Sequence, residues 1–159
     1  MHVLSLVAVL AAPLSAVAIP TGNLGRNNNG QVAARQGPVA PTPCVRQDPP
    51  PTQEELEARF NDFVEAFVGE SKSIAKAFEY IAEDYINHNP MAQNGFQSAW
   101  DILSPFWDSS PTTYIRHMID GDMSWVNYGS SFGQIVDRFR WEGGCIAEHW
   151  DQGEQYPTA

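Results

Sequence analysis

Four segments in the last third of the chain alternate apolar and polar residues with the period of a half-buried β-strand. They span residues 112–119, 123–128, 132–141 and 145–150. The sequences between them are typical of tight turns at Asp120-Gly121 and Gly143-Gly144, and of a looser turn at Gly129-Ser130-Ser131. Because tight turns join neighbouring antiparallel strands, the sequence predicts an antiparallel meander here.

Helical patterns precede these strands. Thr52-Gln53-Glu54-Glu55 is a capping box, after which Leu56, Phe60, Phe63, Val64 and Phe67 recur at helical spacing until Gly69. A second helix is predicted with Ile74, Phe78 and Ile81 on one face. The pattern breaks at residues 85–90, where the residue before Pro90 favours extended backbone, so we expect a short strand.

A third, shorter helix is predicted between the Asn94-Gly95 turn and Ser109, with an apolar face made of Phe96, Trp100, Ile102, Leu103 and Phe106. The expected order is therefore helix, helix, strand, helix and four strands. This order predicts an α+β fold in which three helices pack on one face of a curved, mainly antiparallel sheet.

The N-terminal third differs in composition from the rest. Residues 1–18 have the apolar stretch and the small residues at Ala16 and Ala18 of a secretory signal peptide, and the apolar run is shorter than the roughly 20 residues of a membrane span. Residues 19–51 are rich in Gly, Asn and Pro and predict a disordered linker. The folded domain is expected at 52–151, with a flexible tail at 152–159.

The charge balance excludes several partners. The chain has 19 Asp and Glu against 9 Lys and Arg, a formal net charge of −10. Nucleic acid is therefore not an expected partner, and neither is a membrane once the signal peptide is removed.

Of the two cysteines, Cys44 lies in the linker and Cys145 lies near the end of the domain. Since a signal peptide implies an oxidising compartment, we expect a disulfide between Cys44 and Cys145.

Three segments carry a resemblance to a known family: DYINHNP, RHMIDGDMSWVNY and VDRFRWEGGCIAEHWD. Together they resemble the SnoaL-like polyketide cyclases of the nuclear transport factor 2-like superfamily. The resemblance implies a cone-shaped pocket between sheet and helices, and an aldol-type ring closure without metal or cofactor. It places the acid/base role on Asp137, the first residue of the D-x-F-R sequence.

The residues around Asp137 fit such a role. Strand alternation places Phe139 and Trp141 on its face, which supplies an apolar setting for a carboxylate that takes a proton from carbon. The alternative is an ion pair that only stabilises the fold. His88 or Asn89, in the extended segment before Pro90, could donate a hydrogen bond to a carbonyl oxygen.

The last strand leaves an alternative open. His149 lies on the opposite face from Glu148 and Trp150, and a single bulge decides which face lines the pocket. His149 is a third candidate catalytic residue, beside Asp137 and His88. The candidate ligand-binding residues are Tyr85, Asn89, Trp100, His117, Trp125, Phe139, Trp141 and Glu148, and His117 has the alternative of a core histidine. No sequence motif for a metal site is present, so no metal is expected.

Two functions remain possible from the sequence. The first is a cofactor-independent lyase or isomerase acting on a small hydrophobic carbonyl compound. The second is a secreted, non-catalytic protein that binds a small hydrophobic molecule. A homodimer through the face of the sheet is a further expectation from the resemblance.

Overall fold

The computed structural model describes residues 38–158. Its elements are α1 (Gln53–Val68), α2 (Ile74–Phe78), β1 (Ile81–Asn87), α3 (Phe96–Leu103), a 3-10 turn η1 (Trp107–Ser109), β2 (Thr113–Asp120), β3 (Met123–Ser130), β4 (Gly133–Glu142) and β5 (Cys145–Trp150). The predicted order of helices and strands is confirmed, and so is the α+β class. The predicted signal peptide and the first part of the predicted linker lie outside the described residues.

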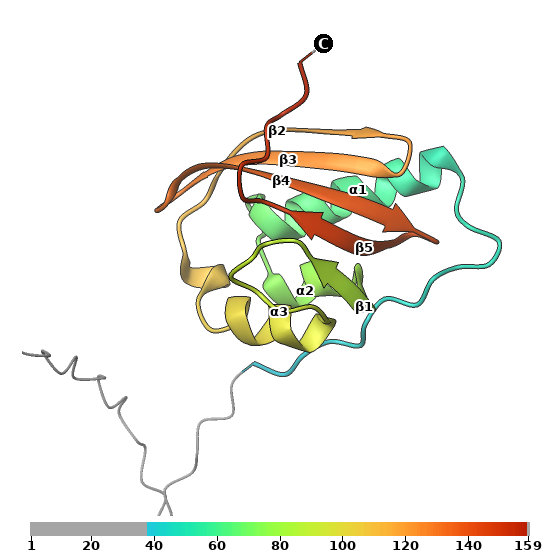
Figure 1. The fold of residues 1–159 in the computed structure, drawn as a ribbon, viewed down its shortest axis with the longest axis horizontal. Helices are drawn as coiled ribbons and strands as arrows, with labels where there is room; N and C mark the ends of the chain where they lie inside the picture. The colour runs from blue at the N-terminus through green and yellow to red at the C-terminus, as the bar shows by residue number, and fades with distance from the viewer. Residues whose placement is uncertain (1–37, 159) are drawn as a thin grey trace, which may run out of the picture. The chain divides into compact units, whose positions relative to one another are not determined.

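The five strands form one sheet in the order β1-β5-β4-β3-β2. β1 runs parallel to β5, and every other neighbouring pair is antiparallel. Helix α1 lies across one face of the sheet, which we call the inner face, and α2 and α3 lie near β1 (Figure 1). The opposite face, which we call the outer face, carries Arg138 and Arg140.

Helix α1 begins at the predicted capping box. The Thr52 hydroxyl accepts a hydrogen bond from the Glu55 backbone N–H, and the Glu55 carboxylate accepts one from the Thr52 backbone. Phe63 then packs edge-on against Phe139 of β4, with ring centroids 5.1 Å apart. The phenylalanine stripe of α1 is thus the helical half of the hydrophobic core.

The boundary between α2 and β1 differs from the prediction. Helix α2 ends at Phe78, and Ile81 is the first residue of β1 instead of part of the helical face. The cause is a contact distant in sequence: the Ile146 N–H donates to the Tyr80 carbonyl oxygen over 2.7 Å, which draws the chain into the sheet. α3 also ends earlier than predicted, at Leu103, and Phe106 is partly exposed.

The hairpin turns lie close to their predicted positions. Asp120 pairs with Met123, so the first turn is centred on Gly121-Asp122, one residue later than predicted. Ser130 pairs with Gly133, so the loop expected to be looser is a tight turn at Ser131-Phe132. Gly121 and Gly143 have φ values of 58° and 56°, a backbone conformation that favours glycine.

The predicted disulfide between Cys44 and Cys145 is present, with Cα atoms 5.7 Å apart. Backbone hydrogen bonds flank it, from Cys44 N–H to the Ile81 carbonyl and from Gln47 N–H to the Gly143 carbonyl, both 2.8 Å long. Residues 44–47, which belong to the predicted linker, therefore lie against the domain. The expected disulfide alone does not imply these two backbone hydrogen bonds.

The C-terminal segment also contacts the domain, although a flexible tail was predicted. Glu154 accepts a hydrogen bond from Arg138 at 2.8 Å, and the Arg116 guanidinium lies 4.0 Å from the ring centroid of Tyr156. Both arginines belong to the sheet, so the segment 152–156 crosses its outer face. Among the described residues, no helix has the length and apolar character that crossing a membrane requires.

Candidate functional site

A cavity of about 130 Å³ lies between the helices and the inner face of the sheet. Its walls are mostly apolar and come from α1, α2, β1, α3 and β4, and they include Phe63, Phe67, Phe78, Ile81, Leu103 and Phe139. One benzene molecule fits a cavity of about 150 Å³. The cavity therefore has room for a ligand the size of a single ring.

Polar groups line one end of this cavity. They are Tyr85 and Asn87 of β1, Asn89 just after it, and His149 and Asp151 at the end of β5. The Asn89 side chain donates to an Asp151 carboxylate oxygen over 2.8 Å, which ties the end of β1 to the end of β5. A ligand in the cavity would meet an apolar wall on most sides and hydrogen-bonding groups at this end.

A β-bulge determines that His149 lines the cavity. Trp141 pairs with Ile146, but its neighbour Arg140 pairs with Glu148, so Ala147 is an extra residue in β5. The extra residue shifts the alternation, and both Ile146 and His149 come to lie on the inner face. Phe139 pairs with His149 and stacks on its ring, with centroids 5.0 Å apart.

Asp137 lies behind His149 and does not line the cavity. It is 3% exposed, and one carboxylate oxygen is 3.3 Å from Nε2 of His149. The contact is within ion-pair distance, but its geometry does not make a hydrogen bond, and Nε2 is buried without another partner among the described residues. The other carboxylate oxygen accepts a hydrogen bond from the Tyr128 hydroxyl over 3.0 Å.

Two tyrosines near this pair are held in the neutral form. Burial, and then the nearby Asp137 and Asp151 carboxylates, raise the pKa of Tyr85 well above its usual value. Burial and the adjacent Asp137 likewise raise the pKa of Tyr128. Both hydroxyls are therefore hydrogen-bond donors at neutral pH, and Tyr85 is one of the residues that line the cavity.

The side chains of Asp137, His149 and Asp151 could together hold a cation. One ligand atom each from Asp137, His149 and Asp151 lie within 4.8 Å of one another. Because these ligand atoms come from β4 and from the end of β5, no local spacing in the sequence predicts them as a metal site. A carboxylate–imidazole set of this kind suits Zn²⁺ or Mn²⁺ better than a soft metal.

Several candidate residues from the sequence lie elsewhere. His88 and Glu148 contact each other on the outer face, at 2.6 Å. Trp125 pairs with Arg138 and so faces the outer side of the sheet. Trp100 of α3 packs against Phe78 of α2, and the Trp141 indole N–H donates to Ser124, so both tryptophans belong to the packed core.

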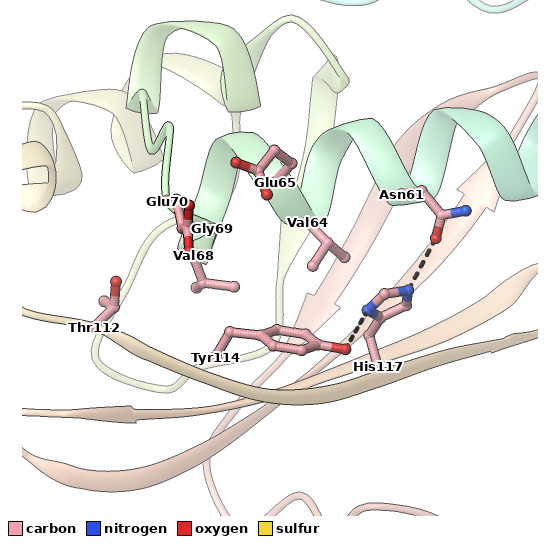
Figure 2. Close-up of a pocket in the computed structure, with 9 residues that line it drawn as sticks. All are labelled: Asn61, Val64, Glu65, Val68, Gly69, Glu70, Thr112, Tyr114 and His117. Atoms are coloured by element: carbon pink, nitrogen blue, oxygen red, sulfur yellow. Dashed lines mark hydrogen bonds between the residues drawn. The ribbon is translucent and has the colours of Figure 1, made fainter.

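His117 lines a different and larger hollow of about 620 Å³ between α1 and β2, together with Asn61, Val64, Glu65, Val68, Gly69, Glu70, Thr112 and Tyr114 (Figure 2). Its two ring nitrogens are 2.9 Å from the Tyr114 hydroxyl and from the Asn61 side-chain oxygen. Burial lowers the pKa of His117, which favours the neutral ring. Both ring nitrogens of His117 thus have hydrogen-bond partners, unlike Nε2 of His149.

Tyr85, Asn89, Phe139 and His149 are the candidate residues that the structure brings together around the small cavity. Asp151 and Tyr128 were not singled out from the sequence. Asp151 ends the segment VDRFRWEGGCIAEHWD, which was a usable signal. Tyr128 had none, because its contact with Asp137 depends on the pairing of β3 with β4.

Comparison with solved structures identifies the architecture. The chain is similar to an NTF2-like protein of unknown function from Burkholderia xenovorans, with 12% identity over 67% of this chain and 89% of that one and a TM-score of 0.51. The chain has the NTF2-like fold. A protein from Kribbella flavida is similar to the same extent, with 13% identity, 59% and 82% coverage and a TM-score of 0.50.

A SnoaL-like protein of unknown function from Burkholderia thailandensis is also among the similar structures, at 12% identity, 64% and 97% coverage and a TM-score of 0.46. That score is too low to add to the assignment of the NTF2-like fold. No protein-family model matches the sequence, and the search of curated proteins finds no match. At these identities the NTF2-like likeness describes the fold alone.

Proposed function

We propose that this chain is a secreted protein of SnoaL-like type that binds a small carbonyl compound and moves a proton on it, with His149 as the base. The observation that carries the proposal is the position of His149 in the cavity wall with Asp137 directly behind it. The signal-peptide pattern of residues 1–18 and the disulfide support secretion.

The size of the cavity supports a small substrate. Ligand pockets for drug-sized molecules usually have volumes of about 300–1,000 Å³. A volume of about 130 Å³ is well below this range and suits a single ring better than a polycyclic one. The apolar walls would hold the ring, and the polar end would receive its oxygen.

His149 suits the role of base better than Asp137, which the resemblance had favoured. Imidazole is the side chain that most often transfers protons near neutral pH. Asp137 can stabilise the imidazolium that forms, because its oxygen lies 3.3 Å from Nε2. We therefore assign Asp137 to charge stabilisation and His149 to contact with the substrate.

Tyr85 completes the proposed chemistry. When His149 removes a proton next to a carbonyl, negative charge develops on the carbonyl oxygen. A neutral hydroxyl in the cavity wall can donate a hydrogen bond to that oxygen, and Tyr85 offers one. Reprotonation of the enolate at the same or another atom then gives exchange or isomerisation, with no co-reactant.

The alternative is a binding protein without catalysis. The predominance of apolar side chains in the cavity wall favours it, since such a cavity binds a small hydrophobic molecule whether or not a base is present. In this alternative, Asp137 and His149 would be a structural ion pair.

Proton exchange separates the two functions. The protein is incubated in D₂O with cyclohexanone, and the loss of α-protons is followed by NMR against a protein-free control. We expect wild type to accelerate the exchange and His149→Gln to reduce this acceleration by about 10²–10⁴-fold, the usual contribution of a general base. His117→Gln is the matched control, because His117 lies outside the cavity.

The outcomes discriminate clearly. Binding of cyclohexanone without any exchange would support the binding protein. Equal exchange by wild type and by the His149→Gln variant would contradict the assignment of His149 as base. Thermal denaturation of both variants shows whether each retains the fold.

A further inference from the structure

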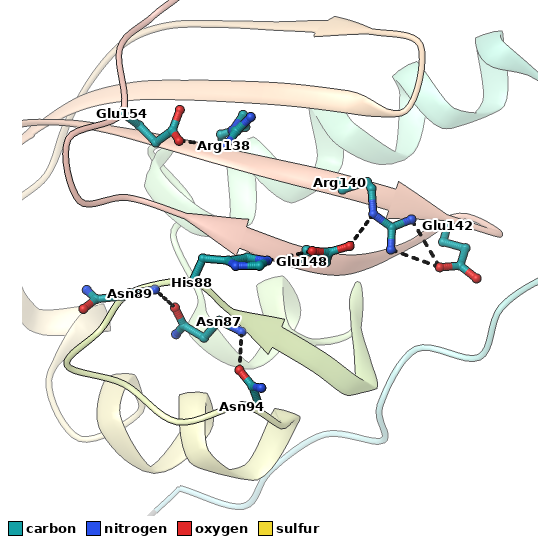
Figure 3. Close-up of polar contacts among 9 residues, drawn as sticks. All are labelled: Asn87, His88, Asn89, Asn94, Arg138, Arg140, Glu142, Glu148 and Glu154. Carbon is teal, nitrogen blue, oxygen red and sulfur yellow. Dashed lines mark hydrogen bonds and ion pairs between the residues drawn. The ribbon is translucent and has the colours of Figure 1, made fainter.

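His88, which the sequence analysis placed in the site, holds a position just outside it. Its backbone N–H donates to the His149 carbonyl over 2.8 Å, so the chain is still extended there. Successive side chains of an extended chain point to opposite sides. Asn89 therefore reaches Asp151 beside the cavity, while His88 lies on the outer face of the sheet (Figure 3).

Two contacts hold the His88 ring on the outer face. Nε2 lies 2.6 Å from a Glu148 carboxylate oxygen. The ring also stacks on Trp150, with centroids 4.2 Å apart and planes only 3° from parallel. Both partners are in β5 and are separated by His149, so the strand that presents the base also anchors the loop.

The partners of His88 are themselves fixed. The Arg140 Nε donates to the other Glu148 oxygen over 2.6 Å, and Arg140 continues to Glu142. Arg138 lies 4.2 Å from the Trp150 ring centroid and bonds to Glu154 of the C-terminal segment. Glu148 and Trp150 are therefore a rigid docking point for a side chain from the loop.

Within the loop that follows, residues 88–95, two hydrogen bonds go to Asn89. The Met91 N–H donates to the Asn89 side-chain oxygen, and the Ala92 N–H donates to the Asn89 carbonyl. At its base the Asn94 side chain accepts from the Asn87 N–H. Asn89 and Ala92 also line the cavity, so a shift of this loop would change the cavity opening.

We propose that His88 is a positioning residue, whose contacts with Glu148 and Trp150 on the outer face hold Asn89 against Asp151 and keep the 88–95 loop over the cavity. The effect of His88 on ligand access rests on the proposed function, because it assumes that the cavity is the ligand site. The effect of His88 on the position of the loop does not depend on that assumption. Access to the cavity is thus controlled by a contact that no ligand touches.

Hydrogen exchange measures the loop directly, on the full chain and without ligand. We expect His88→Ala to speed the exchange of the Ala92 amide roughly tenfold or more, because the hydrogen bond lost involves a charged group. Amides of β3, such as that of Val126, should exchange as in wild type. His117→Ala is the matched control, since it removes a histidine with two side-chain contacts far from this loop.

A conservative variant of His88 and an assay with cyclohexanone complete the test. His88→Gln, which keeps a hydrogen-bond donor, should restore part of the protection that His88→Ala loses. Unchanged loop exchange in His88→Ala, or equal acceleration in β3, would overturn the proposal. If wild type fails to act on or bind cyclohexanone but loop exchange responds to His88→Ala, the proposed function fails and the positioning role stands.

Discussion

Replacing both cysteines, as Cys44→Ala with Cys145→Ala, lowers the free energy of unfolding by up to about 4.7 kcal/mol. The bridge joins residues 101 positions apart, so its loss greatly enlarges the conformational freedom of the unfolded chain. It also frees the segment at residues 44–47 from its covalent anchor at the start of β5. Urea denaturation followed by tryptophan fluorescence measures the change.

Two observations serve as controls. Wild type unfolded in the presence of a reductant should approach the stability of the double variant, because both then lack the cross-link. Limited proteolysis should cut the double variant first near residues 44–47, while α1 onward remains intact. A loss below about 1 kcal/mol would contradict the expected contribution of a loop of this length.

Replacing Asp137 with asparagine is expected to reduce the acceleration of α-proton exchange by about 10²–10⁴-fold. Asparagine keeps the shape of the side chain and can still accept from Tyr128. It removes the negative charge beside Nε2 of His149, which otherwise stabilises the imidazolium. NMR of the exchange reaction in D₂O measures the rate.

Tyr128→Phe is the matched control for this variant. It removes the hydrogen bond to Asp137 but leaves the carboxylate beside His149. We expect it to cost about 1–3 kcal/mol of stability, because a buried carboxylate oxygen loses its donor. Its effect on the exchange rate should be much smaller than that of Asp137→Asn. Equal rates for wild type and Asp137→Asn would leave Asp137 with a structural role only.

The fold could be predicted from the sequence where short local signals determine it. The alternation of β2 to β5 and the glycine-containing turns are properties of a few consecutive residues, and so is the capping box of α1. The end of α2 was not readable, because the pairing of Tyr80 with Ile146 decides it. The position of residues 44–47 likewise depends on partners about 40 and 100 residues away.

The site could be predicted only in part, because some of its residues are also positioned by strand pairing and not by local sequence. Alternation correctly placed Asp137 on the face of Phe139 and Trp141, because β4 is regular. It could not place His149, because the bulge at Ala147 reverses the alternation in β5. Trp125 was misplaced because an aromatic residue does not reveal which face of a sheet it occupies.

The position of a bound ketone tests the central claim most directly. A crystal structure with cyclohexanone should show the ring against Phe139 and the carbonyl oxygen within hydrogen-bond distance of the Tyr85 hydroxyl, with an α-carbon facing His149. A ketone in the hollow beside His117, or one in the cavity with its carbonyl turned away from Tyr85 and His149, would contradict the account.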